Sequence, residues 1–89
     1  MVLPYLIVYA KKNGQTYNRL GITASKKLGK AVVRNRAKRR IRELYRTNIG
    51  KLRSGYDFVI VARSKTASVD YGTLLSAFMS AVEELGVLK

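Results

Sequence analysis

Two apolar segments in the first quarter of the chain predict β-strands. Residues 3–10 read LPYLIVYA and are rich in β-branched and aromatic side chains, which favour a strand. A second strand is predicted over 16–25, where apolar residues alternate with polar or small ones. Asn13-Gly14 lies between them, and this dipeptide is typical of a tight turn because it accepts positive φ. We therefore expect the two strands to form a hairpin.

Beyond Gly29 the apolar spacing changes to that of an α-helix, predicted from Lys30 to Thr47. The expected buried stripe consists of Val33, Ala37, Ile41, Leu44 and Tyr45. Asn48 and Gly50 are typical residues at a helix end. Residues 56–62 (YDFVIVA) form a nearly continuous apolar run, which predicts a central strand covered on both faces.

A second helix closes the chain, with Ser68 or Asp70 as its N-cap and Gly86 at its C-terminal end. Its expected buried stripe consists of Tyr71, Leu74, Leu75, Phe78, Val82 and Leu85. The element order is thus ββαβα within a single domain, residues 1–89. We predict an α+β fold in which one sheet has both helices packed on one face.

That arrangement leaves the other face of the sheet without a cover. The first strand is apolar on both sides, with Tyr5, Ile7 and Tyr9 on one side and Leu6, Val8 and Ala10 on the other. Whichever set faces the helices, the remaining set is too apolar to be left to water. A missing segment, a partner chain or a ligand should cover it. We also expect self-association through this N-terminal strand, whose edge is open to pairing.

The net charge of the chain narrows the range of possible functions. The 89 residues include 18 Lys+Arg against 5 Asp+Glu, a net charge of +13, and such a surplus is typical of proteins that bind polyanions. The chain has no cysteine and no histidine, which excludes thiolate chemistry and every mechanism that needs an imidazole. No run approaches the roughly 18 apolar residues that span a bilayer, and residues 1–10 lack the basic start of a signal peptide. We expect a cytoplasmic protein that makes no membrane contact.

The surplus is concentrated in residues 26–46, where the only acid is Glu43. The cations are Lys26, Lys27, Lys30, Arg34, Arg36, Lys38, Arg39, Arg40, Arg42 and Arg46. On a helical wheel Asn35, Arg39, Arg42 and Arg46 point away from the apolar stripe. A helix face that is merely solvated usually carries charges of both signs at i,i+4. Here positive charges repeat at that spacing, at Arg34, Lys38, Arg42 and Arg46, and their repulsion destabilises the isolated helix. The pattern indicates a nucleic-acid-binding helix, with arginines suited to a bidentate grip on phosphate.

Three other functions fit less well or remain open. An amphipathic basic helix can lie on a membrane, but this one lacks bulky apolar anchors beside its charges. A metal-dependent nuclease acting alone needs clustered carboxylates, and of the five acids only Glu83 and Glu84 are adjacent. A structural RNA-binding protein of ribosomal type would have the same composition, and it stays as the alternative.

Residues 20–46, LGITASKKLGKAVVRNRAKRRIRELYR, closely resemble the signature of the protein subunit of bacterial ribonuclease P. Its core is Arg34-Asn35-Arg36, followed by Lys38-Arg39 and Ile41-Arg42. The resemblance continues through Gly55-Tyr56-Asp57 and Ala62-Arg63 into the closing helix, and so covers essentially the whole chain. It implies a left-handed βαβ crossover, in a fold shared with the second domain of a small-subunit ribosomal protein.

The resemblance implies a non-catalytic subunit of a ribonucleoprotein endonuclease that removes the 5′ leader from precursor tRNA. Magnesium ions held by the RNA subunit would do the chemistry, and no cofactor bound by the protein is expected. The resemblance and the helical wheel together predict an RNA-binding set of Lys26, Lys27, Lys30, Arg34, Asn35, Arg36, Lys38, Arg39, Arg42 and Arg46.

The resemblance also implies a cleft for the single-stranded leader on the open sheet face. Candidates for this cleft are Tyr5, Tyr9, Arg19, Arg63 and Lys65. The two tyrosines fit ordinary sheet packing as well as base stacking. Family members carry an N-terminal segment with a helix that covers this face, and we expect the present chain to lack it, because its first strand begins almost at Met1. We therefore expect the absence of this helix to weaken binding of the leader more than binding of the catalytic RNA.

Overall fold

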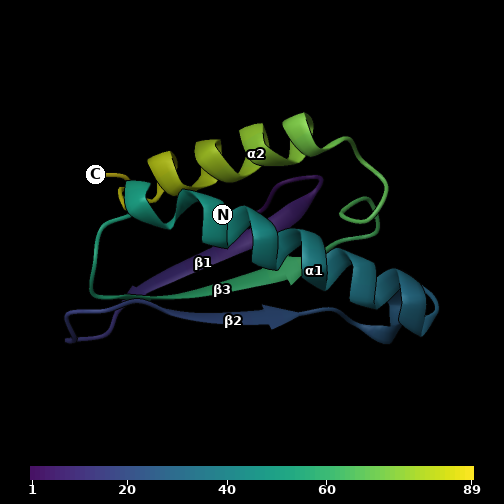
Figure 1. Cartoon of the computed structure of the whole chain (residues 1–89), viewed down its shortest axis with the longest axis horizontal. Coiled ribbons are helices and arrows are strands. Elements are labelled where there is room, and N and C mark those ends of the chain that lie inside the picture. The colour runs from purple at the N-terminus through teal and green to yellow at the C-terminus, as the bar shows by residue number, and fades with distance from the viewer.

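A computed structural model describes all residues, 1–89, as a three-stranded sheet covered on one face by two helices (Figure 1). The strands are β1 (Leu6–Lys12), β2 (Arg19–Thr23) and β3 (Tyr56–Ala62), and the helices are α1 (Ala31–Asn48) and α2 (Tyr71–Glu84). Two short 3-10 helices, Lys26–Leu28 and Ile49–Lys51, flank α1. The predicted α+β class and ββαβα order are confirmed.

The predicted hairpin is wrong, because the sheet order is β1-β3-β2. β3 pairs antiparallel with β1 and parallel with β2, so the most apolar strand lies in the middle. The connection between β1 and β2 passes around the start of β3 and is fixed there by two asparagines. Asn13 Nδ2 donates to Asp57 Oδ1 over 3.0 Å, and Asn18 Oδ1 accepts from the Tyr56 backbone N–H over 2.9 Å. These bonds place β3 between the two strands that are neighbours in sequence.

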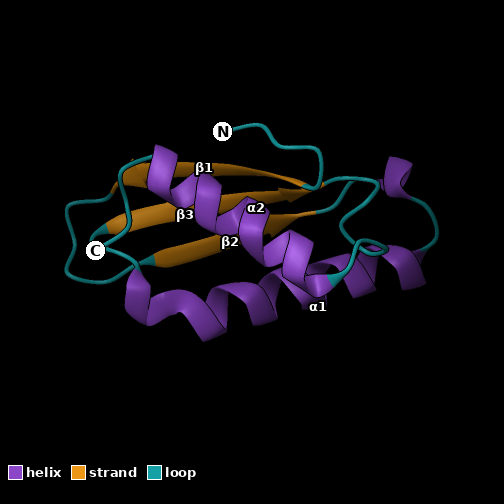
Figure 2. Cartoon of the chain, turned by 90° about the horizontal axis from the view of Figure 1, so that it is seen from above, coloured by secondary structure: helices purple, strands orange, loops and turns teal.

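The crossover from β2 through α1 to β3 is left-handed. Figure 2 views the sheet from its helix side, with β2 and β3 running in the same direction. With both strands turned to point upward, β3 lies to the left of β2 while α1 passes in front. A right-handed crossover is the general rule for parallel strands. The left-handed form is the one that the sequence resemblance implied.

The core lies between the sheet and the helices. β1 contributes Leu6 and Val8, and β3 contributes Phe58 and Ile60, all fully buried. The helices contribute Ala37, Ile41, Leu44 and Tyr45 from α1, and Leu74, Phe78, Ala81 and Val82 from α2. The predicted stripe of α1 is thus confirmed apart from Val33, which is only half-buried.

Capping follows the sequence prediction at both ends of α2. Asp70 is the N-cap: its Oδ2 accepts from the Thr73 backbone N–H over 3.0 Å, and its Oδ1 accepts from Thr73 Oγ1 over 2.7 Å. These bonds lower the pKa of Asp70. Gly86 has φ +75° just after the helix, a conformation that favours glycine. The prediction that Tyr71 belongs to the buried stripe is wrong, because this residue is the first of α2 and is exposed. Its hydroxyl lies 3.5 Å from Thr47 Oγ1.

Three strand predictions need correction. The first strand begins at Leu6, three residues later than predicted, because Met1–Pro4 folds back and Val2 pairs with Ile7. The second strand is confined to Arg19–Thr23, shorter at both ends than predicted. β3 is central as predicted but is covered on one face only, because both helices lie on the same side of the sheet.

Candidate RNA interface

The segment before α1 presents lysines around an uncapped helix start. Lys26–Leu28 forms a 3-10 turn that Ser25 caps by accepting the Lys27 backbone N–H over 3.0 Å. Gly29 follows with φ +132°, which turns the chain into α1. Lys30 is the N-cap of α1 but makes no side-chain capping bond, and no acid lies in the first turn. The free N–H groups and positive dipole of this helix end therefore face lysines instead of a carboxylate, which suits a bound phosphate.

Five of the predicted site residues meet on the outward side of α1. Asn35, Arg36, Lys38, Arg39 and Arg42 line a hollow of about 530 Å³ together with the exposed Val32. We call these five residues the arginine surface. None of them takes part in a side-chain hydrogen bond or ion pair within the chain, although such pairs form elsewhere on α1. Their charges remain unneutralised, so the surface is available to an anionic partner.

Three other arginines of α1 have different surroundings. Arg40 points inward, and its two terminal nitrogens donate to the backbone oxygens of Thr66 (2.8 Å) and Val69. Arg46 pairs with Glu43 over 2.6 Å, which lowers the pKa of Glu43. Arg34 is half-buried, and its Nε is buried without a hydrogen-bond partner. The structure thus separates Arg34 and Arg46, both members of the predicted RNA-binding set, from the arginine surface.

The face of the sheet that points away from the helices, the outer face, carries an apolar patch. Tyr9 of β1 is 52% exposed and lies opposite Val59 of β3, which is 37% exposed. On the far side of Val59, β2 contributes Gly21 and therefore no side chain. A Cβ at Gly21 would lie 3.8 Å from a Val59 methyl group, so the missing side chain leaves that flank of Val59 open. A flat, partly aromatic patch of this kind can receive a base.

The next row of the outer face holds Arg19. Its Nε and Nη2 donate to the two oxygens of Asp57 over 2.7 and 2.8 Å. This bidentate bond lowers the pKa of Asp57 and raises that of Arg19. Both side chains are solvent-accessible, so the pair orients the arginine without removing it from the surface.

The other leader candidates lie near the start of β1 and the end of β3. Tyr5 is half-buried and packs against the core, as sheet packing would require. Arg63 and Lys65 are exposed in the turn after β3, where Arg63 Nη1 donates to the Leu3 oxygen over 3.1 Å. A second hollow, of about 530 Å³, brings Arg63 together with Lys27 and Ile7. It joins the loop before α1 to the outer face.

Sequence reasoning missed the apolar residues that line these sites. The apolar run over 56–62 predicts that Val59 is buried, whereas the structure leaves it exposed, and Leu28 lines the second hollow from the 3-10 turn. Alternation along β3 puts Val59 on the same face as Asp57, but its exposure depends on the side of the sheet that the helices cover. No sequence signal gives that side.

The carboxylates do not form a metal site. No group of three or more acidic, histidine or cysteine side chains lies close enough to hold a metal ion. Glu43 and Asp57 are bound to arginines, and Asp70 caps α2. Neither α1 nor α2 could span a membrane.

Comparison with known proteins identifies the family. The family model for Ribonuclease P matches residues 2–86. The ribonuclease P protein component of Clostridium botulinum strain 657 is 43% identical over 83 residues, covering 92% of this chain and 75% of that protein. The component from Alkaliphilus oremlandii is 40% identical over 83 residues, covering 93% of this chain and 73% of that protein.

Solved structures agree with the sequence comparison. The ribonuclease P protein of Thermotoga maritima superposes with a TM-score of 0.84 at 35% identity, over 94% of this chain and 80% of that one. The Staphylococcus aureus protein gives a TM-score of 0.84 at 28% identity, over 100% of this chain and 82% of that one. These matches decide between the two RNA-binding hypotheses. The chain belongs to the ribonuclease P protein family, the protein components of a ribonucleoprotein endoribonuclease.

Proposed function

We propose that this chain binds the catalytic RNA of ribonuclease P through the arginine surface and the lysines of the preceding loop. The observation that carries the proposal is the hollow on α1, where four cations and Asn35 converge without any internal partner. Arginines in such a cluster bind phosphates bidentately, while the free N–H groups at the start of α1 would donate hydrogen bonds to a further phosphate. Lys26, Lys27 and Lys30 extend the same surface beyond the helix end.

The second part of the proposal concerns the 5′ leader of precursor tRNA. The hollow that joins Lys27 to Arg63 and Ile7 supports a path from the RNA-binding loop onto the outer face. Along this path Tyr9 would stack on a base, while Arg19 and Lys65 would contact the backbone. Tyr5 would support the strand by packing against the core.

The bond cleavage itself is assigned to the RNA subunit in this proposal. The five carboxylates do not cluster, and three of them already bind arginines or cap a helix, so the chain's donor set does not fit a magnesium ion. The protein would raise the affinity of the complex for substrate, and would act in the bacterial cytoplasm.

Reconstitution tests the function. A bacterial catalytic RNA with this chain should cleave precursor tRNA at a magnesium concentration too low for the RNA alone, while the protein alone should not cleave. The double variant Arg39→Ala/Arg42→Ala should lose this rescue, and Arg46→Ala should retain more of it because Glu43 already offsets its charge. Equal rescue by wild type and the double variant would contradict the assignment of the arginine surface.

Salt dependence tests the binding mode separately. If about six cations of the loop and α1 contact phosphates, log K should fall with log salt at a slope of about −4 to −5. Each of Arg39→Ala and Arg42→Ala should flatten this slope by roughly 0.7 to 0.9. An affinity that does not change with salt would exclude a phosphate-dominated interface.

A further inference from the structure

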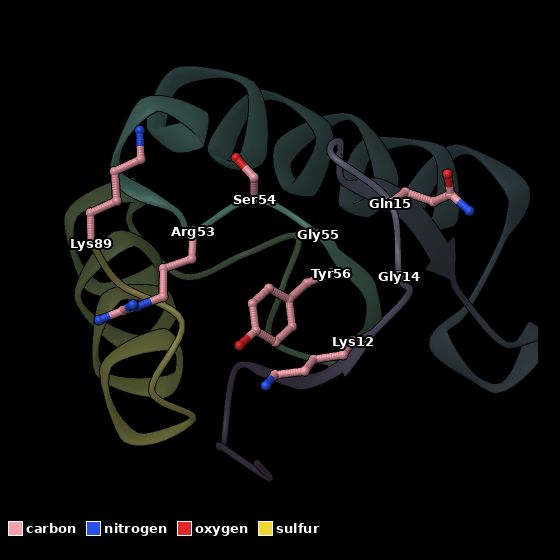
Figure 3. A pocket seen from close by; sticks show the side chains of 8 residues that line it. All are labelled: Lys12, Gly14, Gln15, Arg53, Ser54, Gly55, Tyr56 and Lys89. Atoms are coloured by element: carbon pink, nitrogen blue, oxygen red, sulfur yellow. The ribbon is translucent and has the colours of Figure 1, made fainter.

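A third hollow lies at the end of the molecule opposite the start of α1. Its volume is about 590 Å³, and its lining includes Lys12, Gly14, Arg53, Ser54, Gly55 and Tyr56 (Figure 3). We call it the distal hollow. The turn between β1 and β2, the loop before β3 and the chain's C-terminal segment meet there, at the opposite end of the molecule from the loop before α1 (Figure 1).

The distal hollow is built on closely fixed backbone. Lys12 and Tyr56 are register partners at the ends of β1 and β3. The Asn13 N–H donates to the Gly55 oxygen over 2.9 Å, and Gly55 has φ +89°. A Cβ at Gly55 would lie only 2.9 Å from the Gln15 oxygen, so the two turns approach each other in a way that only glycine allows.

The cations of the distal hollow have no acidic partner. Arg53 Nε donates to the Leu88 oxygen over 3.0 Å, which fixes the guanidinium, while its terminal nitrogens make no bond. The Lys12 ammonium forms no ion pair, since the two ion pairs of the chain are Arg19–Asp57 and Arg46–Glu43. The hollow thus holds two positively charged side chains, of which Arg53 is fixed by its bond to Leu88, and neither of them forms an ion pair within the chain.

Unpaired backbone donors accompany these cations. The N–H groups of Gly14, Ser54 and Gly55 donate no hydrogen bond within the chain. Backbone N–H groups in adjacent turns are common ligands of phosphate oxygens. Their presence beside Lys12 and Arg53 points to an anionic group as the occupant.

An aromatic ring completes the site. Tyr56 is half-buried, and its ring centroid lies 6.2 Å from that of Phe58 in a tilted arrangement. In the view of Figure 3 the Tyr56 ring lies between the side chains of Arg53 and Lys12. A ring flanked by two cations is the combination that binds single-stranded nucleic acid, since the base stacks while the cations hold the backbone.

We propose that the distal hollow binds one nucleotide of a single-stranded RNA, with its phosphate on Lys12 and Arg53 and its base on Tyr56. This site would give the protein a second RNA contact, at the opposite end of the molecule from the lysine-bearing loop that precedes α1. The inference rests on the proposed function only for the source of the RNA, which is either the catalytic RNA or the substrate.

The first experiment uses the free, full chain and needs no catalytic RNA. Hexauridylate, and inorganic phosphate in a parallel titration, are added while the backbone amide signals of Gly14, Ser54 and Gly55 are followed by NMR. We expect hexauridylate to shift all three signals at lower concentration than phosphate does. Lys12→Gln and Arg53→Gln should each weaken this response about fivefold, whereas Lys51→Gln, at the same end but outside the hollow, should not. A thermal melt of each variant checks that it is folded.

The second experiment identifies the source. In the reconstituted enzyme, Lys12→Gln should weaken either binding of the catalytic RNA or, at saturating RNA, binding of the precursor; both outcomes support the site and name its ligand. The proposal is overturned if Lys12→Gln and Lys51→Gln bind hexauridylate equally, or if phosphate and hexauridylate shift the amides alike. A failure of wild-type protein to support cleavage would count against the proposed function and leave the free-protein result standing.

Discussion

Two adjacent arginines of α1 show how burial decides the role of a residue. Arg39 belongs to the arginine surface and bonds to nothing within the chain. Arg40 is half-buried and donates to two backbone oxygens of the turn between β3 and α2. The same side chain is therefore free for the proposed RNA contact at one position and stabilises the fold at the next.

This contrast predicts opposite effects of one substitution at two positions. Arg40→Met keeps the aliphatic stem but leaves the Thr66 and Val69 oxygens without a partner, which should lower the free energy of unfolding by about 1.5 to 3 kcal/mol. Arg39→Met should change stability by less than about 0.5 kcal/mol and instead flatten the salt dependence of RNA binding. Urea unfolding measures the first quantity. Equal destabilisation by both variants would contradict the assignment.

A second residue-scale prediction concerns pH. The bonds from Arg19 and Asn13 lower the pKa of Asp57 in the folded protein, so the contribution of this group is fully present above its unfolded pKa of about 3.9. It is lost as the pH falls through the lower, folded pKa. Asp57→Asn should therefore be less stable than wild type at neutral pH but lose less stability between about pH 4 and pH 2.

Urea unfolding across this range measures the effect. The control is Glu84→Gln, an exposed acid that makes no ion pair within the chain. Wild type should still lose stability in acid through Glu43 and Asp70, whose pKa values are also lowered. An Asp57→Asn variant with the acid dependence of wild type would contradict the role of this pair.

At the scale of the element, the residues of α1 that suit RNA binding are not those that would make the helix most stable. Its inner stripe packs on the sheet, while its outer side and its N-terminus carry charge that opposes helix formation. The N-cap position holds Lys30, which makes no capping bond, although serine or aspartate would stabilise the helix. The N-terminus of α1 is therefore less stable than a capped one would be, at the position where we expect a phosphate to bind.

Lys30→Ser tests this conflict directly. Serine at the N-cap should accept a backbone N–H and raise the free energy of unfolding by about 1 kcal/mol. The same change removes a cation from the interface and should weaken binding of the catalytic RNA, with a slope against salt flatter by roughly 0.7 to 0.9. Thermal unfolding and RNA titration measure the two effects. A variant that gains both stability and affinity would show that Lys30 does not contact RNA.

At the scale of the whole molecule, the sheet has a covered face and an open one. Met1–Leu3 occupies part of the β1 edge, since Val8 donates its N–H to the Met1 oxygen over 3.0 Å. The patch around Tyr9 and Val59 stays uncovered by the chain itself. We therefore keep self-association as a prediction, through packing of this face more than through strand exchange.

Sedimentation of the free protein tests that prediction. Higher salt should favour the dimer, because each chain carries a net charge of +13 and screening reduces the repulsion between copies. Tyr9→Ser should weaken the dimer, while Tyr17→Ser, an exposed tyrosine in the connection between β1 and β2, should not. A monomer at both low and high salt would rule out association through the outer face.

The sequence by itself determined the order of the elements and the chemistry of the basic helix α1. Both helices lie within two residues of their predicted bounds, because apolar periodicity, Asp70 and Gly86 act over short distances. The arginine surface was predictable for the same reason, since residues on one helix face are fixed by their spacing.

Only the tertiary structure decided which strands pair and which charges stay free. β3 lies between β1 and β2 because contacts such as Asn18 with Tyr56 join residues far apart in the sequence. The same long-range packing turns Arg40 inward, leaves Val59 exposed and brings Lys12 beside Arg53. Local patterns carry no information about such pairings, because the pairing depends on how the whole chain buries its apolar surface.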